Sequence, residues 1–136
     1  MLYGIGCDLC SAARIEKSLT GPHGAAFAQR VFGAAERSLL GLDEPWPASR
    51  AGQRLASRAA ANFAAKEAFL KAAGTGLREP FSMVDIEAVR LENGAPAYHF
   101  SGQTAVWVAE HGLAAHLSLS HEEGMAMAVC VLETRG

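Results

Sequence analysis

Several features that would point to particular classes of protein are missing from this sequence. Three cysteines in 136 residues are too few for a disulfide framework, so we expect a reducing, cytoplasmic setting. No apolar run approaches the roughly 18 residues of a membrane span. The start lacks the basic region of a signal peptide and reaches Asp8 early. The net charge of −2 argues against a basic nucleic-acid-binding module. We therefore expect neither a membrane nor a nucleic acid as partner.

The composition that remains is that of a globular protein. Hydrophobic residues make up 50% and charged residues 19%, which excludes intrinsic disorder. The length fits a single domain over residues 1–136, large enough to bury a core without disulfides or metal.

Hydrophobic periodicity predicts an α+β fold with a largely antiparallel sheet and one long helix. Ser11 is the expected N-cap of the first helix, and Gly74 the residue that ends the long helix. Asn93-Gly94 and Glu122-Glu123-Gly124 predict hairpin turns. Strands are expected at 2–9, 83–91, 97–100, 115–121 and 125–132, and helices at 11–19, 24–32, 34–41, 48–73 and 101–111.

Cys7 and Cys10 have the C-x-x-C spacing of redox and zinc motifs. A structural zinc site needs four ligands, and Cys130 is the one remaining cysteine. The simpler interpretation is two small residues at a strand end, and a thiol redox protein is kept as an alternative.

Glycine and histidine patterns exclude other sites. Gly4-x-Gly6 fails as a dinucleotide fingerprint because Leu9 occupies the third glycine position. His116 and His121 are five apart in a predicted strand, so they point to opposite faces and do not share a metal through one face.

Two carboxylates and a lysine are the most informative group. Glu67 and Lys71 lie four apart on the long helix, where an ordinary ion pair is one interpretation. The surrounding sequence is apolar, however, and charges on a buried helix need partners. Asp8 ends the first strand in a similar neighbourhood. Together they predict a hard-cation site that also holds phosphate.

Arginines at positions 50, 54 and 58 repeat every four residues on the same helix. Such a stripe is usually a solvated face. Beside a metal and lysine site it could instead extend an anion-binding surface.

Several blocks together resemble the holo-acyl-carrier-protein synthase family of small phosphopantetheinyl transferases. The likeness covers nearly the whole chain, and its most specific part is the helix motif with the aspartate upstream. The blocks are Gly4-Ile5-Gly6-Cys7-Asp8-Leu9 with Arg14-Ile15-Glu16, Phe27 to Phe32 with Glu36, Phe63 to Ala72 with Gly74-Thr75-Gly76, Asp85-Ile86-Glu87, Asn93 to Pro96, and His116 to His121.

The resemblance implies transfer of 4′-phosphopantetheine from coenzyme A (CoA) to a serine of an apo acyl carrier protein, with release of 3′,5′-ADP. It implies Asp8 and Glu67 as ligands of Mg²⁺, or Mn²⁺, with Lys71 against the phosphates. Asp8, Glu67 and Lys71 are then the catalytic residues. Either Glu67 or a metal-bound water takes the serine proton. CoA contacts are expected from Arg54, Lys71, Gly74, Thr75, His116 and Ser118, and carrier-protein contacts from Arg14 and Lys17 on the first helix.

The resemblance also implies an α/β hammerhead fold and a homotrimer with CoA sites between subunits. Asn62 departs from the pattern, since family members often carry Arg or Trp there, and Arg54 or Arg58 is expected to substitute. Two further alternatives are a non-catalytic module that binds CoA or carrier proteins, and another Mg²⁺-dependent enzyme acting on a pyrophosphate. The sequence leaves open whether the carrier serves fatty-acid, polyketide or peptide synthesis.

Overall fold

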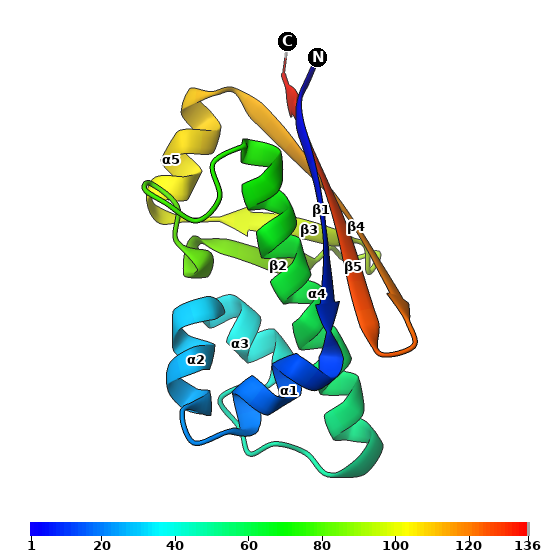
Figure 1. The fold of residues 1–136 in the computed structure, drawn as a ribbon. Helices are drawn as coiled ribbons and strands as arrows, with labels where there is room; N and C mark the ends of the chain where they lie inside the picture. Colours follow the sequence, from blue (N-terminus) through cyan, green and yellow to red (C-terminus); the bar gives the residue numbers. More distant parts are fainter. Residues whose placement is uncertain (136) are drawn as a thin grey trace.

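A computed structural model describes residues 1–135, which form helices and two antiparallel sheets around one long helix (Figure 1). In chain order the elements are β1 (Leu2–Ser11), α1 (Ala12–Thr20), α2 (Gly24–Val31), α3 (Ala34–Leu40), α4 (Ser49–Ala73), the 3₁₀ helix η1 (Met83–Asp85), β2 (Ile86–Arg90), β3 (Pro96–Phe100), α5 (Gly102–Glu110), β4 (Leu113–Glu122) and β5 (Met125–Thr134). The α+β prediction and the long helix are confirmed.

The strands divide into two sheets where the periodicity suggested one. β1, β5 and β4 form a three-stranded sheet in that order, and β2 pairs only with β3 among the strands of residues 1–135. A strand was expected over 83–91, but β2 is shorter than that because residues 83–85 form η1. Figure 1 shows α4 running along the three-stranded sheet, with α1, α2 and α3 gathered around its first half.

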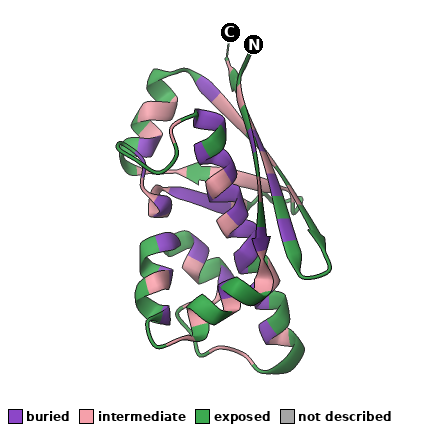
Figure 2. Ribbon diagram, viewed as in Figure 1, coloured by how far each residue is buried: buried purple, intermediate pink, exposed green. Residues whose placement is uncertain are grey.

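Small residues let α4 lie directly against β1. A Cβ at Gly6 would overlap the carbonyl oxygen of Ala68, so only glycine allows this approach. The facing side of α4 is rich in alanine, and Figure 2 shows that most of its central turns are buried. The helix ends at Gly74, which has φ of +84° as predicted for a left-handed C-cap.

The two faces of the three-stranded sheet differ because side chains alternate along each strand. One face packs on α4 and carries Asp8, which lies opposite Ala128 on β5. The other face presents Ile5, Leu9 and Met127, which are 61%, 62% and 39% exposed. Within residues 1–135, no helix is both long enough and apolar enough to cross a membrane.

Candidate active site

Asp8 and Lys71 meet where β1 crosses the last turn of α4. The Lys71 ammonium donates to Asp8 Oδ1 at 3.0 Å and to the Cys7 carbonyl oxygen at 3.0 Å. The Asp8 side chain is 18% exposed and that of Lys71 is 54% exposed. Among the ion pairs of residues 1–135, Lys71 therefore pairs with Asp8 across two elements and not with Glu67 on its own helix.

Glu67 lies one turn before Lys71 on α4, and the charges of Asp8 and Lys71 both act on the pKa of its carboxyl. Partial burial raises the pKa of the Glu67 carboxyl above 4.5, and the negative charge of Asp8 raises it further. Lys71 opposes that effect, and its own pKa is raised, chiefly by the hydrogen bond to Asp8. Two carboxylates thus share one lysine, and the group keeps a negative charge that favours a bound cation.

The donor set of this group fits Mg²⁺. No three His, Cys, Asp or Glu side chains of the described residues come together as a complete metal site. Mg²⁺ does not require one, because it usually takes one or two protein carboxylates and fills its octahedron with water and substrate phosphate. Asp8 and Glu67, which we call the acidic pair, are the oxygen donors that would hold it.

A groove beside this group is lined by side chains of α1. Its volume is about 510 Å³, and Arg14 and Lys17 line it together with Phe63 of α4. Ser11 caps α1 as predicted, with its hydroxyl accepting from the Arg14 amide at 3.3 Å. Burial and the charges of Asp8 and Glu67 raise the pKa of Cys10 to about 11, while Arg14 opposes the shift. The groove therefore opens beside the acidic pair.

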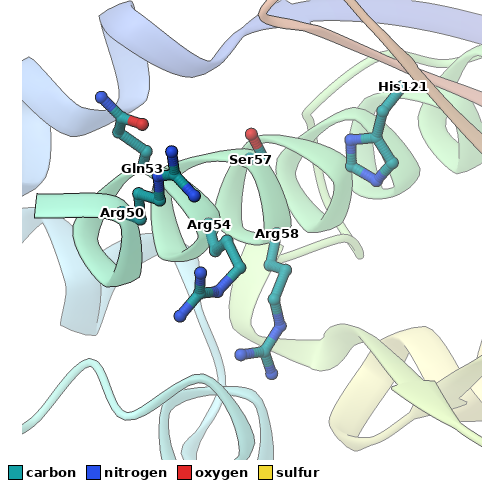
Figure 3. A pocket seen from close by; sticks show the side chains of 6 residues that line it. All are labelled: Arg50, Gln53, Arg54, Ser57, Arg58 and His121. Carbon is teal, nitrogen blue, oxygen red and sulfur yellow. The ribbon is translucent and has the colours of Figure 1, made fainter.

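A second pocket lies on the first half of α4, toward the other edge of the sheet (Figure 3). Its volume is about 410 Å³. Its lining consists of Arg50, Gln53, Arg54, Ser57, Arg58 and His121. The arginine stripe is thus one wall of a pocket, and β4 contributes a histidine to it. We define these six residues as the arginine pocket.

His121 is the residue that sequence reasoning missed. Its strand position places it opposite Ala126, on the face of the sheet that packs on α4. The strand alternation does indicate that His116 and His121 face opposite ways, but not which face α4 covers. His116 lies on the far face, with Nε2 2.7 Å from Glu133 Oε1. Ser118 shares that face by alternation, so neither residue joins the arginine pocket of its own chain.

The remaining predicted residues are placed as follows. Gly74 and Thr75 directly follow the last turn of α4, and the Thr75 hydroxyl donates to the Gly76 carbonyl at 3.1 Å. Asn62 is buried, donating to Glu36 and to the Ala88 carbonyl, so it faces away from both pockets.

The redox alternative finds no support in the arrangement of the cysteines. Cys7, Cys10 and Cys130 are all free. Cys7 and Cys10 are three residues apart on β1, which puts their side chains on opposite faces with Cα atoms about 10 Å apart. A disulfide needs Cα atoms within about 7 Å.

The fold thus brings the carboxylates of Asp8 and Glu67 together with the Lys71 ammonium at one place. The chain belongs to the 4′-phosphopantetheinyl transferase superfamily, whose family model matches residues 4–130. It is similar to the holo-[acyl-carrier-protein] synthase of Leptothrix cholodnii, with 38% identity over 136 residues that cover 100% of this chain and 99% of that protein.

Solved structures of the same kind of protein match the fold. The holo-[acyl-carrier-protein] synthase from Neisseria meningitidis has a TM-score of 0.77 and 34% identity, covering 98% of this chain and 100% of that one. The Bacillus anthracis protein, solved in complex with CoA (3′,5′-ADP), has a TM-score of 0.76 and 34% identity, covering 98% of both chains. The family resemblance of the sequence is confirmed.

Proposed function

We propose that this chain is a holo-[acyl-carrier-protein] synthase, which transfers 4′-phosphopantetheine from CoA to a serine of an apo acyl carrier protein. The serine oxygen bonds to the β-phosphorus of CoA, and the bond from that phosphorus to the bridging oxygen breaks. The serine proton is lost to a base, and 3′,5′-ADP leaves. Family membership over nearly the full chain supports the reaction. The observation that carries it is the group formed by Asp8, Glu67 and Lys71.

Phosphoryl transfer depends on positioning and charge neutralisation more than on a nucleophile from the enzyme. When bound at Asp8 and Glu67, Mg²⁺ would supply positive charge to the pyrophosphate. Lys71 holds a second positive charge beside it, kept protonated because the hydrogen bond to Asp8 raises its pKa. Glu67, whose pKa is also raised, is a candidate to accept the serine proton.

The arginine pocket and the group formed by Asp8, Glu67 and Lys71 lie far apart in one chain. This separation favours a CoA site made by two copies of the chain. Arg54 and Glu67 are 13 residues apart on one helix, which is about 20 Å along its axis at 1.5 Å per residue. One ribose separates the pyrophosphate of CoA from its 3′-phosphate, so these two phosphate groups are too close together to reach both sites in one copy of the chain. Asp8 lies on edge strand β1 and His121 on edge strand β4, so neighbouring copies could bring the two groups together.

The exposed apolar face of the three-stranded sheet supports such an assembly. Ile5, Leu9, Met125 and Met127 are all at least 39% exposed on that face. Exposed apolar surfaces of this kind commonly mark protein–protein contacts. We place the trimer contact there, and with it the predicted contacts of His116 and Ser118, which share this face.

Replacing Arg54 with alanine is expected to raise KM for CoA about tenfold, as for loss of about 1.4 kcal/mol of binding. The positive charge of the arginine pocket would otherwise attract the 3′-phosphate. Dephospho-CoA, which lacks that phosphate, should be used equally by the variant and the wild type. Steady-state kinetics with both donors tests this, with Arg30→Ala on α2 as the matched control. Equal loss with both donors would contradict the assignment.

Charge reversal at Arg14 is expected to raise KM for the carrier protein about tenfold at low salt, equivalent to about 1.4 kcal/mol. Arg14 and Lys17 line one groove. Their positive charges would attract an acidic carrier protein and bring its serine close to Asp8 and Glu67. Kinetics of Arg14→Glu should show an unchanged KM for CoA and an effect that fades as salt rises. Lys17→Glu should act more weakly, and Arg78→Glu should have no effect. An unchanged carrier KM in Arg14→Glu would place the docking surface elsewhere.

Release of 3′,5′-ADP separates this function from the alternatives. With CoA, Mg²⁺ and an apo carrier protein, we expect one 3′,5′-ADP per carrier modified, measured by chromatography, and none after addition of EDTA. A binding module would release no nucleotide. An enzyme acting on another pyrophosphate would also release none from CoA, and one that hydrolyses the CoA pyrophosphate would release it without the carrier protein. Either result would contradict the proposal.

A further inference from the structure

Lys66 carries a charge inside the protein that the reaction does not use. Its side chain is fully buried, next to Glu67 in the sequence. The ammonium donates to the carbonyl oxygens of Met83 at 2.9 Å and Ile86 at 2.6 Å, and to the Glu36 carboxylate. All three donors of the ammonium are therefore occupied.

Glu36 is equally buried and equally satisfied. Besides Lys66, it accepts from the amides of Gly33 at 3.1 Å and Ala88 at 3.0 Å, and from the Asn62 side chain at 3.0 Å. The pair thus joins α4 to α3, to η1 and to β2. We call Glu36 and Lys66 the buried pair.

Stability alone does not account for the buried pair. Burial raises the pKa of Glu36 and lowers that of Lys66, and each residue partly offsets the shift of the other. Well-packed apolar residues often stabilise a protein as much as such a pair does. The hydrogen bonds of the buried pair are directional, and they therefore fix the rotation of α4 about its axis in a way that apolar contacts do not.

The rotation of α4 decides where Glu67 stands relative to Asp8. A side chain on an α-helix ends about 6 Å from the axis, so a rotation of about 10° moves it about 1 Å. A displacement of about 1 Å at a catalytic centre can cost about a hundredfold in rate. Lys66 lies in the same turn as Glu67, about 100° further round the helix at 3.6 residues per turn, so its bonds hold Glu67 in register with β1.

We infer that Glu36 and Lys66 are positioning residues, which hold the Glu67 carboxylate at the distance from Asp8 that a divalent cation requires. The inference rests on the proposed function for its catalytic consequence. The inference also predicts that the buried pair affects how tightly Asp8 and Glu67 bind a divalent cation. That affinity can be measured without turnover.

The decisive variant is Lys66→Met combined with Glu36→Gln, which removes both charges of the buried pair together, leaves the net charge of the interior unchanged, and is expected to fold. Leu55→Ala is the matched control, since it weakens the buried side of α4 three turns away from Glu67. Mn²⁺ affinity is measured by electron paramagnetic resonance on the folded proteins, with Asp8→Asn identifying binding at the acidic pair. Values of kcat and KM are measured on the same samples.

The double variant should bind Mn²⁺ at least about tenfold more weakly, and its kcat should fall about ten- to a hundredfold. KM for the carrier protein should not change, because Arg14 lies on α1. Leu55→Ala should lose stability but keep Mn²⁺ affinity. A folded double variant with wild-type Mn²⁺ affinity would overturn the inference. If the wild type binds Mn²⁺ but transfers nothing, the proposed function fails while the Mn²⁺ comparison still decides the role of the pair.

Discussion

Replacing Glu67 with glutamine is expected to abolish phosphopantetheine transfer while leaving the fold intact. Glutamine keeps the size of the side chain but removes the charge that would hold Mg²⁺ with Asp8. The raised pKa of Glu67 means that ionisation is less favourable in the folded chain than in the unfolded one. That contribution to stability is present at low pH and is lost as pH rises through the raised pKa. Without metal at pH 7, the variant should therefore be at least as stable as the wild type.

The raised pKa of Glu67 also predicts how the activity of the wild type depends on pH. Metal binding needs the ionised carboxylate, so activity should fall as the pH drops through the raised pKa, starting at higher pH than for an ordinary glutamate at 4.5. Thermal unfolding and a transfer assay on Glu67→Gln, with Glu110→Gln on α5 as control, test both points. Residual transfer near the wild-type rate would show that the acidic pair is not the metal site.

Replacing Lys71 with alanine is expected to lower kcat about ten- to a thousandfold, the range for one lost electrostatic contact in a transition state. Lys71 bonds to Asp8, but an exposed ion pair contributes little to stability. Charge on the departing 5′-phosphate of 3′,5′-ADP grows as the bond breaks, so the lysine should act on kcat more than on KM for CoA.

Kinetics and unfolding of Lys71→Ala separate this role from a structural one. The variant should unfold at nearly the wild-type temperature, and Arg135→Ala, another exposed cation, should behave as wild type in both measurements. Loss of stability with an unchanged kcat would instead assign Lys71 to the fold.

Much of this architecture could be predicted from local sequence. Ser11 and Gly74 mark helix ends by their own chemistry, and the alternation over 115–121 gives β4 and its two faces. Asp8, Glu67 and Lys71 could be grouped because each is a charge in apolar sequence that needs a partner. The partner of Lys71, however, proved to be Asp8 and not the neighbouring glutamate.

The features that could not be predicted from the sequence depend on contacts between distant residues. His121 and Arg54 are 67 positions apart, and only the placement of α4 across β4 joins them in the arginine pocket. The pairing of Glu36 with Lys66 likewise depends on how α3 packs on α4. Periodicity also does not determine which strands bond to one another, so the division into two sheets was not predicted.

The mass of an apo carrier protein tests the central claim most directly. After incubation with the wild-type chain, CoA and Mg²⁺, its intact mass should rise by about 340 Da, the formula mass of phosphopantetheine. A carrier with its acceptor serine replaced by alanine should gain nothing, and neither should the wild-type carrier after incubation with Glu67→Gln. A carrier that keeps its apo mass with the wild-type chain would contradict the account.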